Sequence, residues 1–310
     1  MLRIGERLLL FAVVSESILG SLGNGFIGIV YCIDCVKKKK FSMIGFILTG
    51  LAISRFFLIW LIITDGFMKI FSSDLYILSH LIYYVSYLWI VTNQLSIWFA
   101  TSLSVFYLLK IAHFSHHIFL WLKKRINRVL LLLMGFLLIS WMLIFPNVVR
   151  IINKRTENKS TVSYIHNSNT EFFIHQILFN LGAIVLFALT LMNCVFLIVS
   201  LWRHHKQMQA NFTGSKDPST RAHMKAMKIV LSFIILFVLY FIGIVIEIIC
   251  STMPENQLLF MFGMTTAVLY PCGHSFILIL GNNQLKKASE SVLQQFKCLR
   301  RNLTECHGQV

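Results

Sequence analysis

Seven long apolar stretches, separated by short polar segments, constrain this chain more than any other feature. Each is long enough to cross a hydrocarbon core of about 30 Å, which takes about 20 residues at 1.5 Å rise per residue. With 57% apolar residues and a mean hydropathy of +0.74, the 310-residue chain is not an ordinary soluble domain. We predict an all-α membrane protein with one seven-helix domain over 1–310, its spans covering roughly 8–33, 44–68, 81–109, 129–149, 172–201, 229–252 and 257–281.

Lysine and arginine gather in alternate loops. Four segments, among them the tail 282–310, hold 20 of the 28 basic residues, whereas the intervening four hold 7. The positive-inside rule then places the N-terminus outside and the tail in the cytoplasm. An odd number of spans with this polarity is typical of a G-protein-coupled receptor in the plasma membrane. The net charge of +16 is explained by topology and anionic lipid, so no nucleic-acid partner is expected.

Cysteines, histidines and sequons give weaker signals. Cys298 and Cys306 in the tail are either palmitoylated or plain free thiols. Three histidines at 113, 116 and 117 have a spacing that could bind metal, but a solvated basic cluster at the membrane surface is favoured. Of three N-glycosylation sequons, only Asn158 lies on the predicted extracellular side. We find no enzyme motif and expect no cofactor.

Two polar residues lie at mid-depth in predicted spans, Asn24 in the first and Arg55 in the second. Because about 11 residues separate Arg55 from either end of its span, its side chain cannot reach the membrane surface. We therefore expect an internal partner, such as Asn24 or a backbone carbonyl, and a role in holding helices together.

Polar and aromatic residues recur at helical spacing in the outer halves of three spans. They lie on one face of each helix and could surround an outward-opening, mostly aromatic cavity with one acid, as small-molecule sites usually do. Polar side chains that only join helices are the alternative for each residue alone. The set comprises Ser86, Trp89 and Asn93, then Gln176 and Asn180, then Tyr240 and Glu247.

The long inner segment 202–228 is punctuated by Gly214 and Pro218, which indicate a turn between helical extensions of spans five and six. Its flanks are basic, and either a cytosolic partner docks there or the residues simply anchor the membrane surface. The residues in question are Arg203, Lys206, Lys225 and Lys228.

Five motifs in order resemble the type 2 taste receptors, the bitter receptors, over essentially the whole length. Phe106, Tyr107 and Lys110 stand where most rhodopsin-like receptors carry D-R-Y, and His274-Ser275 replaces N-P-x-x-Y. The motifs are GSLGNGFI (20–27), LAISR (51–55), WFATSLSVFYLLKIA (98–112), LIVSLWRH (197–204) and YPCGHSFILIL (270–280).

The resemblance implies a receptor for small bitter compounds, coupled to a gustducin-type G protein and then to phospholipase C and calcium. It implies ligand contacts at Trp89 and Asn93, with Tyr240 near the pocket floor. It also implies control of the inactive–active equilibrium by motif residues, which are Asn24, Arg55, Phe106, Tyr107, Lys110, Ser200, His274 and Ser275.

Two departures from the family pattern are Leu186, where many relatives have proline, and His113, where asparagine is usual. Rival hypotheses are a pheromone-type receptor and, less favoured, a small transporter. A transporter would carry inverted repeats and helices broken at mid-depth, and we find no repeat.

Overall fold

A computed structural model describes nine helices within residues 3–39, 42–71, 81–112, 117–136, 138–139, 142, 182–203, 205–206, 218–252 and 257–307. No strand occurs in these ranges. The helices are α1 (Ile4–Lys38), α2 (Met43–Phe71), α4 (Leu81–Ile111), α5 (His117–Lys124), Ile126–Phe136, Gly182–Arg203, α8 (Pro218–Thr252), α9 (Gln257–Gly281) and α10 (Asn283–His307).

Six of the described helices are long and apolar enough to cross a membrane, and they match six of the seven predicted spans. The seventh, in the region of predicted span 129–149, is described as the shorter apolar helix Ile126–Phe136. α1 and α8 each run 35 residues and extend beyond their predicted spans. Polar turns such as Lys37–Lys38 thus continue the helix past the apolar stretch, which hydropathy alone does not reveal.

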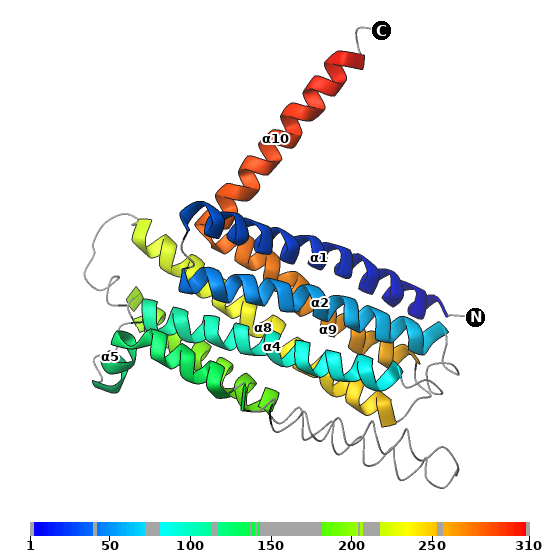
Figure 1. Cartoon of the computed structure of the whole chain (residues 1–310), viewed down its shortest axis with the longest axis horizontal. Coiled ribbons are helices and arrows are strands. Elements are labelled where there is room, and N and C mark those ends of the chain that lie inside the picture. The colour runs from blue at the N-terminus through cyan, green and yellow to red at the C-terminus, as the bar shows by residue number, and fades with distance from the viewer. Residues whose placement is uncertain are drawn as a thin grey trace.

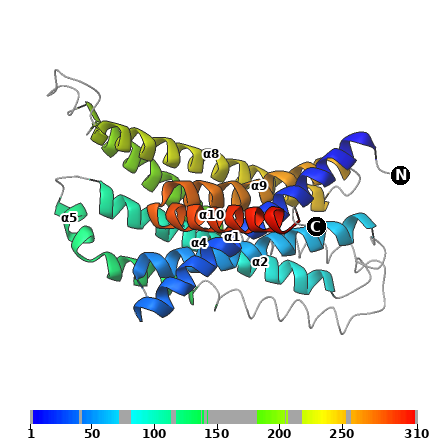
Figure 2. The same cartoon turned by 90° about the horizontal axis from the view of Figure 1, so that it is seen from above.

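α9 packs between α1 and α8 and also contacts α2, and α2 in turn packs against α1 and α4 (Figures 1 and 2). Glycines permit these close approaches. A Cβ at Gly243 of α8 would lie 2.9 Å from the Ala267 backbone nitrogen of α9. At Gly20 of α1 it would lie 3.2 Å from the Cβ of Cys272. Small residues at helix contacts are the usual means of packing in a membrane, where burial between apolar helices gives little driving force.

Buried polar bonds fix the register between helices. The amide of Asn24 donates to the Pro271 carbonyl of α9 at 3.0 Å and to the Gly20 carbonyl of its own helix at 2.8 Å. The Thr101 and Thr190 hydroxyls lie 2.7 Å apart and join α4 to helix Gly182–Arg203. Leu186 also contributes here, because its carbonyl accepts from the Thr101 hydroxyl of α4 at 3.4 Å.

α10 begins where α9 ends and projects away from the bundle (Figure 1). Asn282 joins the two helices. Its side-chain oxygen accepts from the Gln284 backbone amide at 2.9 Å, while its amide donates to the Tyr31 hydroxyl of α1 at the same distance. Asparagine is a favoured N-cap because it satisfies amides that the first turn leaves free. The bundle end near α10 is also where α1, α4 and α5 carry lysines in their last turns.

Candidate functional site

The predicted polar faces of α4 and α8 meet in the middle of the bundle. Asn93 is fully buried and Trp89, one turn away, is 9% exposed. The Tyr240 hydroxyl of α8 donates a hydrogen bond to the Asn93 side-chain oxygen. Ser86 lies in α4 one turn beyond Trp89, but its side chain is outside the described part of the structure. The hydrogen bond between Tyr240 and Asn93 joins residues that are 147 apart in the sequence.

Glu247 lies two turns from Tyr240 on α8 and is partly buried. It is next to Gly263 of α9, where an added Cβ would lie 3.4 Å from the Glu247 Cγ. Lys69 and Asp65 at the end of α2 are within electrostatic reach of the Glu247 carboxylate. These two form an ion pair at 2.6 Å, and the lysine also lies 5.1 Å from the Phe260 ring centre. This charged group therefore borders the same bundle end as Glu247.

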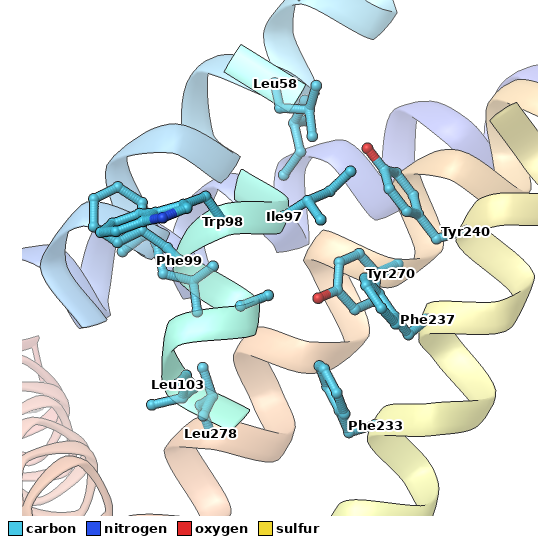
Figure 3. Close-up of a cluster of buried hydrophobic side chains, with 14 of the residues drawn as sticks. Leu58, Ile97, Trp98, Phe99, Leu103, Phe233, Phe237, Tyr240, Tyr270 and Leu278 are labelled. Carbon is cyan, nitrogen blue, oxygen red and sulfur yellow. The ribbon is translucent and has the colours of Figure 1, made fainter. Parts of the chain in front are cut away.

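Aromatic rings extend inward from Tyr240. Its ring centre is 5.0 Å from that of Tyr270 on α9, and Tyr270 stacks on His274 at 5.7 Å. Phe233 and Phe237 of α8 cover the other side of Tyr270, at 6.1 and 5.3 Å. Figure 3 shows the Tyr270 hydroxyl pointing toward α4, between Ile97 and Leu103. Such tilted ring pairs add about 0.5–1.5 kcal/mol each beyond their buried area.

Arg55 is fully buried against this stack. Its guanidinium carbon lies 4.5 Å from the Tyr270 ring centre, a cation–π contact. Its three side-chain nitrogens have no hydrogen-bond partner of normal geometry among the described residues, and the Tyr270 hydroxyl is the polar group near them. Neither expected partner, Asn24 or a backbone carbonyl, therefore bonds to the Arg55 side chain among the described residues. Because Gly20 lets α1 approach α9 closely, Asn24 reaches the Pro271 carbonyl instead.

The remaining motif residues lie where their helices place them. His274 and Ser275 are buried in α9, and the Ser275 hydroxyl donates to the Cys272 carbonyl at 2.6 Å. Ser200 is 7% exposed in helix Gly182–Arg203. On α4, Phe106 is buried beside Tyr107, and the Lys110 ammonium lies 5.4 Å from the Phe106 ring centre.

The basic residues predicted at the inner mouth are partly described. Arg203, Lys206 and Lys228 are exposed, and Lys206 lies 4.5 Å from the Trp202 ring centre. Lys225 is in α8, with its side chain outside the description. Gln176, Asn180 and Asn158 also lie outside the described residues. Among the described residues, no group of three or more His, Cys, Asp or Glu could hold a metal ion.

Sequence reasoning assigned no role to Tyr270, which connects Arg55 to Tyr240. A signal was available, because Tyr270 precedes His274 by four residues and so shares its helix face. Ser102 and Thr49 were also missed; both have buried hydroxyls without a partner among the described residues. Small hydroxyl residues in an apolar helix give no pattern by which to find them.

Comparison with known proteins decides the family. The family model described as taste receptor protein (TAS2R) matches residues 1–297. The chain belongs to the TAS2R family of taste receptors. Relatives include taste receptor type 2 member 10 of Papio hamadryas, 62% identical over 98% of this chain and 99% of that protein. Member 10 of Homo sapiens is 60% identical over the same shares, and member 114 of Rattus norvegicus is 52% identical over 94% and 95%.

The family settles several expectations. This TAS2R chain has the seven-helix fold of a G-protein-coupled receptor and is a bitter taste receptor, not an enzyme. The pheromone-receptor and transporter hypotheses are thereby excluded. The full-length resemblance inferred from five motifs is confirmed, because the relatives align over nearly the whole chain.

Proposed function

We propose that this receptor binds small bitter compounds in a pocket formed by the outer halves of α4, α8, α9 and the segment containing Gln176 and Asn180. The observation that carries the proposal is the Tyr240–Asn93 hydrogen bond, which brings two predicted ligand-facing helices together at one depth. The Asn93 amide nitrogen has no partner among the described residues, so a ligand acceptor can use it. Trp89 offers an aromatic surface one turn farther out.

Ligand binding acts by shifting an equilibrium between two helix arrangements. A ligand changes that equilibrium only by its difference in affinity for the two. Since Tyr240 bonds to Asn93 and packs against Tyr270, a ligand that competes for Asn93 changes the forces on α8 and α9 together. The inner ends of α8 and of helix Gly182–Arg203 then move outward and uncover the surface near Tyr107, Lys110 and Lys225.

At the inner face the partner is a gustducin-type heterotrimeric G protein, acting through phospholipase C and calcium. Lysines at the bundle end near α10 support this orientation, with the N-terminus extracellular and the tail in the cytoplasm. The receptor resides in the plasma membrane, where its basic loops contact anionic lipid, and Asn158 carries glycan on the outer side.

A calcium-release assay tests the proposal. Cells that express the chain with a chimeric G protein are exposed to a panel of bitter compounds, and responses are expected from several of them. Silence across the panel, with surface expression confirmed, would refute the function.

The pocket is tested in the same assay. Asn93→Ala is expected to raise the EC50 of most agonists about tenfold or more, equivalent to about 1.4 kcal/mol. Leu88→Ala is the matched control, because Leu88 is on α4 near Asn93 but is 51% exposed on the outside of the bundle. An unchanged potency profile for Asn93→Ala would place the pocket elsewhere.

A further inference from the structure

The centre of the bundle contains a concentration of buried hydrogen-bond donors. Arg55 is 0% exposed, and its Nε, Nη1 and Nη2 atoms have no acceptor among the described residues. A guanidinium has five N–H donors and no acceptor, and it keeps its charge in proteins. The unsatisfied group is therefore a full positive charge.

Three other buried polar atoms without partners belong to side chains linked to Arg55 by contact. The Tyr270 hydroxyl is on the ring that the guanidinium covers at 4.5 Å. The His274 Nδ1 is on the ring stacked on Tyr270. The Asn93 Nδ2 is on the amide whose oxygen is already bonded to Tyr240. All three atoms can donate a hydrogen bond, and together with the five N–H groups of Arg55 the donors in this cluster outnumber the acceptors.

The cluster also lacks a counter-charge. The ion pairs within the described residues are Asp34–Lys38, Asp65–Lys69 and Lys286–Glu290, none of which includes Arg55. The carboxylates of Glu16 and Glu247 are on α1 and α8 toward their outer ends. An unpaired charge buried in a low-dielectric interior is strongly unfavourable unless an opposite charge compensates it. Water would satisfy the donors but would leave the charge.

We propose that Arg55 and the Tyr270 hydroxyl bind a small monovalent anion, chloride under physiological conditions. The anion supplies a further acceptor and the missing charge, with His274 as a third donor group when its Nδ1 carries the proton. Arg55 is on α2 and Tyr270 is on α9, so the bound anion stabilises the packing of these two helices. The proposal does not depend on the identity of the bitter ligand or of the G protein.

Thermal unfolding of the purified full-length receptor in detergent tests this site. Sodium chloride is replaced stepwise by sodium gluconate at constant ionic strength, and bromide and nitrate are tested in parallel. A ligand that binds only the folded state raises its stability. We expect the Tm to be about 2 °C or more higher in saturating chloride, a shift typical of modest ligand stabilisation in a protein of this size. Bromide and nitrate should act like chloride, and gluconate should not.

Variants show whether the anion is bound at Arg55. Arg55→Met is expected to abolish the chloride dependence, whereas Lys69→Met, which also removes one cation from α2, should retain it. If Arg55→Met does not yield folded protein, Tyr270→Phe decides. This variant loses one donor and keeps the charge, so its half-saturating chloride concentration should rise about threefold or more.

Three outcomes would overturn the proposal. One is a wild-type Tm that is equal in chloride and gluconate, which would leave water as the partner of these donors. Another is chloride dependence that persists in Arg55→Met. The last is a half-saturating concentration that does not change in Tyr270→Phe.

Discussion

Two cations on α2, Lys69 and Arg55, have opposite surroundings. Lys69, in the last turn of α2, pairs with Asp65 one turn away at 2.6 Å, and both side chains keep some exposure, 36% and 21%. Arg55, in the middle of the helix, is completely buried, and its neighbour is the Tyr270 ring where Lys69 has a carboxylate. At the C-terminal end of α2 the lysine is thus neutralised by a carboxylate of the same helix, whereas the arginine in the middle depends on side chains from other helices.

This difference suggests different roles: the Asp65–Lys69 pair stabilises α2 locally, whereas Arg55 responds to the arrangement of the helices. An i, i+4 ion pair survives any movement of α2 as a rigid body, so it cannot report on helix arrangement. The contacts of Arg55 change whenever α2 and α9 move, because Tyr270 belongs to α9. Unsatisfied polar atoms around Arg55 can also gain partners in a second arrangement, which is the property that a two-state switch requires.

Replacing the central cation should have the largest effect. Arg55→Met keeps similar length but removes the charge and the contact with Tyr270, so we expect the maximal calcium response to fall about tenfold or more. Surface expression should persist, because replacing a poorly compensated buried charge by an apolar side chain is often neutral or stabilising. Calcium release, normalised to surface receptor by flow cytometry, measures the change.

Lys69→Met is the control for this prediction, with an expected change of less than threefold. Equal losses in the two variants would show that the middle and the C-terminal end of α2 do not differ in function.

The Tyr240–Asn93 bond tests the central region without altering charge. Tyr240→Phe removes the donor and leaves the buried Asn93 amide unsatisfied, which costs about 1–3 kcal/mol. We expect the EC50 to change at least about fivefold, by a similar factor for chemically unrelated agonists, because the lost bond is between helices. Dose–response curves for three unrelated agonists measure this.

Tyr84→Phe is the matched control, since Tyr84 is on α4 but is 51% exposed. Factors that differ widely among agonists in Tyr240→Phe would instead make the tyrosine a direct ligand contact.

Helix faces could be predicted from the sequence, but contacts between helices could not. The spacing of Trp89 and Asn93, and of Tyr240 and Glu247, placed each pair on one face, and the structure joins Asn93 to Tyr240. Spacing along one helix carries no information about the rotation and depth of its neighbour. The hydrogen bond between Asn93 and Tyr240, which are 147 residues apart, could therefore not be predicted from spacing.

Arg55 shows the same limit: its burial could be predicted from the sequence, but its partner could not. Its depth in the span correctly predicted an internal environment, and it is fully buried. Asn24 is not its partner, because α1 approaches α9 closely at Gly20 and the Asn24 amide donates to the α9 backbone instead. The partner ring, Tyr270, is on a helix more than 200 residues later in the sequence, and only the folded packing brings the two together.

Removing the ion pair at the C-terminal end of α2 should give the smallest effect. Asp65→Asn removes a partly exposed pair whose order, acid before base, suits a helix, and Lys69 in the last turn also benefits from the helix dipole. We expect the free energy of unfolding to fall by about 0.3–0.5 kcal/mol. The EC50 should change by less than about threefold, because the pair lies within one helix. Screening makes the loss in Tm smaller at high ionic strength, which is raised here with sodium gluconate so that chloride stays constant. A tenfold or larger change in EC50 would mean that this pair, like Arg55, is coupled to the arrangement of the helices. Lys69 and Arg55 would then not differ in function.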